Sequence, residues 1–434
     1  MRIDRLGQLG DAPAVLRWVA DAARRHSLPA PAALIGDWFG SRAVIAPSLD
    51  ATPATEVFAS KSPVASLAQA HPGTSTRVGG GWFGYLSYPD GRGAPRIPEA
   101  AGGWSDSVLH QDTDGDWWHE SLSGATLPAW LAEVYEAPSR PYTLAWTAPD
   151  RDQHLTGVAA CLEAIGAGEV YQACVCTQFH GRLSGDPLDF FVDAVTRTSP
   201  ARAAYIAGAW GAVASLSPEL FLRRRGESVI SSPIKGTLPL HKSPSLLRAS
   251  VKDVAENIMI VDLVRNDLGR LAETGSVTVP ELLRVRPAPG VWHLVSTVSA
   301  RIAADVPMSD ILEATFPPAS VTGTPKARAR ELLQKWEAYR RGIYCGTVGL
   351  ASPGAGTEMN VAIRTVEFDA QGAAVLGVGG GITADSDPAA EWEECLHKAA
   401  PVIGLGQLDA DWPGASAATH SPVPEKTSPV PEKT

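Results

Sequence analysis

Short apolar runs bounded by glycine and proline recur along this 434-residue chain, and they constrain its fold more than any other feature. Residues 1–140 contain such runs at 43–46 and 79–86. Further runs follow at 170–177, 203–207, 211–216, 343–350, 361–368 and 374–378. Short apolar segments between turn-forming residues are typical of strands joined by tight turns. We therefore predict that strands dominate, above all in residues 1–140.

Other segments show the periodicity of helices, and they lie at 152–167, 252–271 and 388–403. In the second, apolar residues such as Val254, Ile258 and Val261 recur every three or four positions and form one apolar face. The chain ends on the segment SPVPEKT, which occurs at 421–427 and again at 428–434. Because proline and charge cannot bury a core, we predict a disordered tail over residues 407–434.

Composition restricts the class of protein. A formal net charge of −10 without a basic stripe argues against binding to nucleic acid. Uninterrupted apolar stretches are too short for a membrane span or a secretory leader. The five cysteines fit neither a disulfide framework nor a metal site, so we expect free thiols in a reducing compartment. We predict a cytoplasmic protein with about two or three domains or one composite fold.

Carboxylates occur in pairs on two of the predicted helices. Asp253 and Glu256 lie three residues apart on one, and Glu391 and Glu394 lie three apart on the other. Residues with this spacing project from one face of a helix. If the helices face each other, the four carboxylates can hold a hard divalent cation, and Mg²⁺ is favoured where substrate oxygens and water complete its shell. The alternative is that both pairs decorate solvent-exposed faces.

Several cationic and glycine-rich positions fit an anionic ligand. Arg364 interrupts an apolar strand, where an inward guanidinium needs an anion such as a carboxylate. The glycine-rich run 377–382 follows a predicted strand, and its backbone N–H groups can approach an anion closely, although such a run is also typical of a turn. Lys398 follows Glu394 by four residues, which also fits a surface ion pair, and His293 also fits a core histidine.

A lysine between two conformationally restricted residues is the leading candidate for chemistry. Lys235 lies in the segment 231–237 (SSPIKGT), after Pro233 and before Gly236. Lysine is readily converted by its surroundings into a nucleophile, although a lone loop lysine is more often solvated. Glu219 stands between two apolar strands, where burial can raise the pKa of its carboxyl group and make it a general acid. Its alternative role is a cap or an edge-strand charge.

From about residue 148 to 406 the chain resembles the chorismate-utilising enzymes, in many blocks that follow the family's order. The blocks are 217–219 (SPE), 255–270 (AENIMIVDLVRNDLGR), 293–296 (HLVS), 320–326 (SVTGTPK), 363–365 (IRT), 379–382 (GGGI), 385–388 (DSDP) and 391–394 (EWEE). The resemblance implies an α+β fold of two stacked, mostly antiparallel β-sheets flanked by helices, an α/β/β/α sandwich. Residues 1–140 are then the strand-rich amino-terminal part of a composite fold, and 148–406 the chorismate-binding catalytic domain.

The resemblance also implies the ligands. Mg²⁺ is expected to bridge Glu256 and Glu394 to the ring carboxylate of chorismate, with Asp253 and Glu391 close by. Arg364 would bind the enolpyruvyl carboxylate. The complete set of expected substrate-binding residues is Gln172, His293, Ser320, Tyr344, Arg364, Gly379, Gly380, Gly381 and Lys398.

Two positions select among the members of this family. Members that add water carry a lysine base where this chain has Gln172, which argues against isochorismate or salicylate synthesis. Anthranilate synthases usually have alanine where this chain has Lys235, whereas aminodeoxychorismate synthases with lysine use it as a nucleophile. Sixteen residues separate Glu219 from Lys235, as in those enzymes. The related enzymes often have asparagine where this chain has Cys174, which leaves the effect of that change open.

The resemblance thus predicts an aminodeoxychorismate synthase component I of p-aminobenzoate or folate-type biosynthesis. Lys235 would form a covalent adduct with chorismate and Glu219 would act as general acid. Because no glutaminase-like cysteine motif is visible, we expect ammonia from a separate glutamine amidotransferase subunit. The alternatives are an anthranilate synthase component I and an inactive chorismate-binding homologue.

Overall fold

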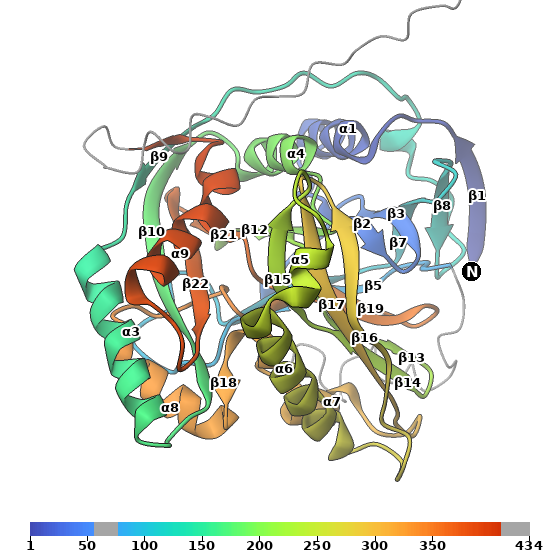
Figure 1. Cartoon of the computed structure of the whole chain (residues 1–434). Coiled ribbons are helices and arrows are strands. Elements are labelled where there is room, and N and C mark those ends of the chain that lie inside the picture. Colours follow the sequence, from blue (N-terminus) through green and yellow to red (C-terminus); the bar gives the residue numbers. More distant parts are fainter. Residues whose placement is uncertain (56–76, 409–434) are drawn as a thin grey trace, which may run out of the picture.

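The glycine- and proline-bounded runs form the strands of two large sheets in the computed structural model, which describes residues 1–55 and 77–408 (Figure 1). The repeated SPVPEKT segment lies outside the described residues, as does the rest of the predicted tail from residue 409 onward. Residues 407 and 408, assigned to that tail, form a short strand at the edge of one sheet.

The larger sheet has 13 strands within the described residues and is antiparallel except at its last pair. In spatial order its strands are β1 (Arg2–Gly7), β8 (Trp117–Ser121), β7 (Ser107–Gln111), β3 (Ser41–Ala46), β2 (Ala32–Trp38), β11 (Arg202–Gly208), β12 (Gly211–Ser217), β21 (Thr365–Asp369), β22 (Ala373–Ile382), β10 (Gln172–Ser184), β9 (Thr143–Thr147) and β23 (Gln407–Leu408), with β18 (Gly323–Thr324) beside β10.

The smaller sheet has ten strands in the same part of the chain and is antiparallel throughout. Its order is β15 (Ile234–Pro239), β17 (Val291–Arg301), β14 (Ser228–Ser232), β13 (Leu220–Arg225), β20 (Gly356–Val361), β19 (Thr347–Ser352), β5 (Gly81–Leu86), β6 (Ala100–Ser105) and β4 (Thr52–Pro53), with β16 (Thr278–Ala288) beside β17.

Apolar side chains from the inner faces of both sheets form one buried cluster. Leu34 and Val213 of the larger sheet belong to it together with Phe83 and Leu350 of the smaller sheet. The amino-terminal strands are integral to both sheets, because β2 pairs with β11 and β5 pairs with β19. The described residues of 1–140 therefore share a core with the strands that follow.

Helices pack on the outer faces. Helices α1, α4 and α9 share a core with the larger sheet (Figure 1). Helices α3 and α8 lie against β10 of that sheet, whereas α6 and α7 cover the smaller sheet. Their bounds are α1 (Ala12–Arg25), α3 (Arg151–Gly166), α4 (Pro187–Thr198), α5 (Ser245–Ala249), α6 (Val251–Gly269), α7 (Met308–Thr315), α8 (Lys326–Trp336) and α9 (Pro388–Ile403), with 3₁₀ turns η1 (Ala129–Leu131) and η2 (Ala319–Val321). This arrangement confirms the predicted α/β/β/α sandwich.

Helix α1 is an element that the strand-rich pattern of residues 1–140 did not predict. Asp11 caps its first turn by accepting a hydrogen bond from the backbone of Ala14, and Pro13 occupies the first turn, where a missing N–H costs nothing. Val15 and Val19 then bury one face against the larger sheet. The Gly- and Pro-rich composition of the region masks the helix in the sequence, although the Asp11 cap and the local periodicity indicate it.

Two other observations concern the whole described chain. All five cysteines are buried and free, as predicted. Among the described residues, none of the helices combines the length and the apolar character that a membrane crossing requires.

Candidate active site

Lys235 is presented by an irregularity in the strand that carries it. In β15, Ile234 pairs with Val295 and Thr237 pairs with His293, so β15 has one more residue than β17 between these pairs. Gly236 absorbs this bulge with φ +83°, a left-handed conformation that favours glycine. The Pro–Ile–Lys–Gly pattern of the sequence thus becomes a bulged edge strand whose lysine points toward the other sheet.

Glu219 lies in the turn between β12 and β13 and is 3% exposed. Its backbone N–H donates to Ser217 Oγ at 3.1 Å, and its carbonyl accepts from Val361, so the turn is held on both sides. Burial raises the pKa of its carboxyl group to about 7, even though the Ser320 hydroxyl and the Lys235 ammonium partly oppose the shift. A carboxyl group with this pKa can donate a proton near neutral pH.

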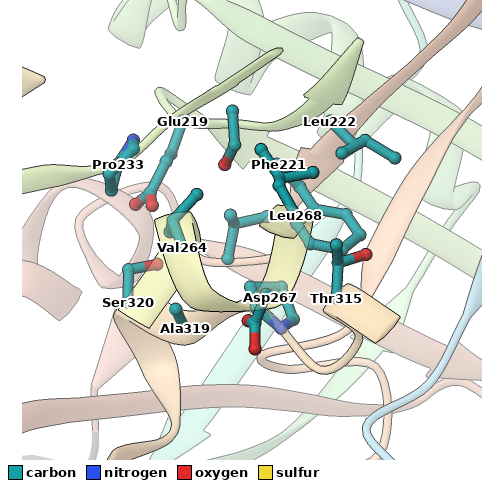
Figure 2. A pocket seen from close by; sticks show the side chains of 13 residues that line it. Glu219, Phe221, Leu222, Pro233, Val264, Asp267, Leu268, Thr315, Ala319 and Ser320 are labelled. Atoms are coloured by element: carbon teal, nitrogen blue, oxygen red, sulfur yellow. The ribbon is translucent and has the colours of Figure 1, made fainter. Parts of the chain in front are cut away.

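A small, largely apolar cavity lies beside Glu219, with space for about one water molecule (Figure 2). Phe221, Val264 and Leu268 supply much of its apolar wall. At its far side Asp267 forms an ion pair of 2.6 Å with Lys326. The apolar wall explains why ionisation of Glu219 is costly, since it keeps bulk water away from that carboxyl group.

The predicted metal-binding glutamates gather between α6 and α9, and each contacts a lysine. Lys235 Nζ lies 3.6 Å from Glu256 Oε2, and Lys398 Nζ lies 2.7 Å from Glu394 Oε1. Helix α9 packs against β22 and helix α6 against β15 (Figure 1). The structure therefore brings Glu256, Glu391 and Glu394 together, as the paired spacing required.

Glu391 has the most confined carboxylate of the set, with a side chain only 2% exposed. Its Oε1 accepts hydrogen bonds from Lys252 Nζ at 2.7 Å and from Ser386 Oγ at 2.6 Å. Its Oε2 is buried and has no hydrogen-bond partner among the described residues. An unsatisfied buried carboxylate oxygen is a ready ligand for a hard cation.

The donor set therefore fits Mg²⁺ in its chemistry, but not as a complete cage. Nowhere in residues 1–55 and 77–408 do three or more His, Cys, Asp or Glu side chains form a group that could hold a metal ion. A cation would need further oxygens, such as those of a substrate carboxylate. Asp253 lies against Gly236 of β15, where a Cβ on that glycine would come within 3.1 Å of it. Its proposed place near a metal stays a prediction.

The glycine run 379–381 lies against Lys235, Glu256 and Lys398, and its secondary structure differs from the prediction. The sequence placed a strand at 374–378 and a turn-like run after it, whereas β22 continues to Ile382 and includes Gly379, Gly380 and Gly381. A Cβ on Gly381 would lie 2.9 Å from Lys235 Nζ, 3.2 Å from Glu256 Oε2 and 2.5 Å from Gln172 Nε2. Because these three side chains come so close to the strand at this point, glycine is needed at position 381 for them to meet there.

Arg364 has the properties of a ligand-binding cation. It lies between β20 and β21 with φ +50°, a conformation that is uncommon outside glycine. Burial lowers the pKa of its guanidinium, and no charged neighbour in the described chain offsets this shift. An arginine without an ion-pair partner in such a place suits a carboxylate brought by a ligand.

The remaining predicted residues surround the same space. His293 accepts or donates at Nδ1 with Thr237 Oγ1 at 3.1 Å, while its Nε2 is buried and lacks a partner in the described chain. Burial and the nearby Arg364 lower the pKa of His293 to about 4, so the ring is neutral at pH 7. Gln172 Oε1 is likewise buried without a partner among the described residues, and the buried Ser320 hydroxyl lies beside the Glu219 carboxyl group. Together they offer polar atoms that a bound molecule can satisfy.

Tyr344 and Lys398 complete the set. The ring of Tyr344 lies over Gly377, where a Cβ would be only 2.2 Å from it, so glycine is required for the tyrosine to reach this position. Lys398 Nζ donates to the carbonyl of Gly379 at 3.0 Å in addition to its ion pair. Five of the predicted site residues thus contact the glycines of β22: Lys235, Gln172 and Glu256 at Gly381, Lys398 at Gly379 and Tyr344 at Gly377.

Sequence reasoning missed two residues that touch the carboxylates, Lys252 and Ser386. Lys252 is four residues before Glu256 on α6, a spacing that predicts an ion pair and could have drawn attention to it. Its contact with Glu391 could not be found in this way, because 139 residues separate the two in sequence.

Comparison with known proteins agrees with this geometry. Residues 38–404 match the family described as chorismate binding enzyme. The chain belongs to this family. Among its relatives, the aminodeoxychorismate synthase component 1 of Escherichia coli (strain K12) is 36% identical over 343 residues, which cover 74% of this chain and 75% of that protein. The anthranilate synthase component 1 of Streptomyces coelicolor is 37% identical over 275 residues, covering 61% and 54% of the two chains.

Solved structures of proteins similar to this chorismate-binding enzyme show the same fold. The anthranilate synthase component I of Streptococcus pneumoniae TIGR4 superposes with a TM-score of 0.66 at 22% identity, covering 93% of this chain and 92% of that one. The menaquinone-specific isochorismate synthase of Escherichia coli gives a TM-score of 0.70 at 19% identity, with 94% of each chain covered. At these identities the likeness establishes the fold and leaves the reaction to be decided by the site.

Proposed function

We propose that this chorismate-binding enzyme is an aminodeoxychorismate synthase component 1, which converts chorismate and ammonia to 4-amino-4-deoxychorismate. The observation that carries the proposal is the position of Lys235, which lies against Gly381 of β22 and is close enough to the buried Glu219 to influence its carboxyl group. A nucleophile and an acid with a pKa of about 7 are the two groups that this substitution needs. Relatives that carry the name of this activity support it.

The chemistry follows from these two side chains. Lys235 Nζ, as the neutral amine, forms a bond to C2 of the chorismate ring, the ring double bonds shift, and the C4–O bond breaks. Glu219 supplies the proton with which the C4 hydroxyl leaves as water. Ammonia then forms a bond to C4, the double bonds shift back, and the C2–N bond to Lys235 breaks. The enolpyruvyl group stays on the ring.

Substrate recognition uses the unsatisfied groups of the site. We propose that Arg364 binds the enolpyruvyl carboxylate, with Tyr344 and the β22 backbone beside it. His293 Nε2, Ser320 Oγ and Gln172 are available for the ring substituents and for ammonia. Glu256 and Glu394 would hold Mg²⁺, with Glu391 and Asp253 close by, and the ion would offset the charge of the ring carboxylate.

Ammonia requires a source outside the described site. The related proteins carry "component 1" in their names, which indicates a second component in each of those enzymes. We propose that the second component here is a glutamine amidotransferase subunit, and that the product serves p-aminobenzoate or folate-type biosynthesis. A cytoplasmic location remains a prediction from the free thiols.

Product identification tests the proposal. The purified chain, given chorismate, Mg²⁺ and ammonium at mildly alkaline pH, is expected to form 4-amino-4-deoxychorismate without pyruvate release, as judged by mass spectrometry. Glutamine should replace ammonium only when the amidotransferase subunit is added. Anthranilate and pyruvate as the only products would refute the assignment.

Anthranilate synthesis is the second candidate, because a relative of that name aligns over 61% of the chain. It differs in needing no lysine nucleophile. Lys235→Ala separates the two, since an anthranilate synthase should keep its activity when this lysine becomes alanine.

A further inference from the structure

Lys252 lies among the carboxylates proposed to bind the metal, and neither the proposed reaction nor substrate recognition uses it. It belongs to the first turn of α6, and its side chain reaches across to α9. Its Nζ lies 2.7 Å from Glu391 Oε1 and 4.0 Å from Glu256 Oε1. The ammonium group thus bridges carboxylates that come from two different helices.

The three glutamates are matched by three lysines. Glu256 contacts Lys235, Glu394 contacts Lys398, and Glu391 contacts Lys252. A divalent cation added to this balanced set leaves an excess positive charge next to three ammonium groups. A dianionic substrate added alone meets three carboxylates. Charge balance is restored when the cation and the dianion are present together.

Lys252 differs from Lys235 and Lys398 in the contacts that its ammonium group makes. Lys235 is the proposed nucleophile, and Lys398 is tied to the carbonyl of Gly379. The Lys252 side chain is 38% exposed, close to the 41% of Lys398, but its Nζ contacts only Glu391 and Glu256 in the described chain, so it can turn toward solvent when a metal ion takes over these carboxylates. Glu391, which it holds, is almost fully buried and keeps its second oxygen unsatisfied.

We propose that Lys252 is an internal counter-ion of the metal site: it orients Glu391 and Glu256 and opposes binding of a divalent cation until the substrate carboxylate arrives. Lys252 is therefore a positioning residue that couples metal binding to substrate binding. The inference rests on the proposed function for the identity of the dianion, but its effect on the metal alone does not depend on the reaction.

Mn²⁺ binding in the absence of chorismate tests this role directly. Titration of the full chain with Mn²⁺, followed by the electron paramagnetic resonance of the free ion, should show Lys252→Met binding about tenfold or more tightly than the unaltered chain. Lys252→Arg keeps the charge and should bind as weakly as the unaltered chain. Lys242→Met removes the same net charge from the exposed turn after β15 and should also leave Mn²⁺ affinity unchanged.

The coupling provides the second measurement. Chorismate should increase the Mn²⁺ affinity of the unaltered chain by a larger factor than that of Lys252→Met, since the variant no longer opposes the metal. Equal or weaker Mn²⁺ binding by folded Lys252→Met, with its melting temperature near that of the unaltered chain, would overturn the proposal. If the product were anthranilate instead, the proposed function would fail while the Mn²⁺ result stood unaffected.

Discussion

Glu219 and Glu394 are both glutamates of the candidate site, yet their surroundings shift the pKa values of their carboxyl groups in opposite directions. Glu219 is almost fully buried beside an apolar cavity, and burial raises the pKa of its carboxyl group to about 7. The side chain of Glu394 is 47% exposed, and although partial burial raises the pKa of its carboxyl group, the ammonium groups around it, above all that of Lys398, lower it further than burial raises it. One surrounding favours a proton donor and the other a permanently charged ligand.

This contrast shows how one fold obtains two kinds of chemistry from glutamate. The β12–β13 turn with the apolar face of α6 defines the acid side, around Glu219. The three glutamate–lysine pairs between α6 and α9 form the side that we propose to bind the metal. Lys235 lies between the two sides, since it contacts Glu256 and also influences the Glu219 carboxyl group. A substitution of Glu219 should therefore affect proton donation, and a substitution of Glu394 should affect metal binding.

Removal of Lys235 should have the largest effect. Lys235→Ala deletes the nucleophile, so aminodeoxychorismate formation should fall by about 10³-fold or more, measured by product quantification under saturating Mg²⁺ and ammonium. Lys242→Ala, a change at an exposed lysine, is the matched control and should be unaffected. Formation within about tenfold of the unaltered chain would remove the covalent role.

Removal of the proposed general acid, Glu219, should reduce the rate nearly as much. Glu219→Gln removes the donated proton and should lower kcat by about 10²–10⁴-fold, while calorimetry shows chorismate binding largely retained. Glu394→Gln sharpens the comparison, because its defect should be relieved by higher Mg²⁺. If raised Mg²⁺ also rescued Glu219→Gln, the division into an acid side and a metal side would be wrong.

The pH dependence of the rate should report Glu219. The acid must carry its proton, and the pKa of about 7 means that this form is lost as pH rises through neutrality. Once pH exceeds about 7, kcat should fall by up to about tenfold per pH unit, measured with ammonia held at a constant concentration of its free base. A rate that stays level from pH 7 to 9 would contradict a general-acid role for this residue.

The smallest expected effect is on stability. The folded-state pKa of Glu219 is above its ordinary value of 4.5, so the unaltered chain loses stability as pH rises from about 4.5 through about 7. Glu219→Gln lacks this titration and should gain about 1–3 kcal/mol relative to the unaltered chain between pH 5 and pH 8. Urea unfolding at both pH values measures the difference. Glu394→Gln should show no such gain, because the pKa of Glu394 is lowered.

Much of the fold was accessible from local patterns, and the exceptions have physical causes. Short apolar runs marked the strands because side chains alternate across a sheet, and helical periodicity marked α6 and α9. Helix α1 was missed because its Asp11 cap is a local signal within a Gly- and Pro-rich region. The end of β22 was missed because glycine is uncommon within strands, and here its small size lets side chains such as Lys235 and Tyr344 lie against the strand.

The sequence by itself determined the inventory of this site: a lysine between proline and glycine, an acid sixteen residues before it, and two pairs of carboxylates at helical spacing. Only the tertiary structure decided how those groups act on one another. Burial beside an apolar wall sets the proton affinity of Glu219, and a contact across 139 residues places Lys252 on Glu391. Electrostatic energies depend on distance and on the exclusion of water, and both are properties of the folded chain.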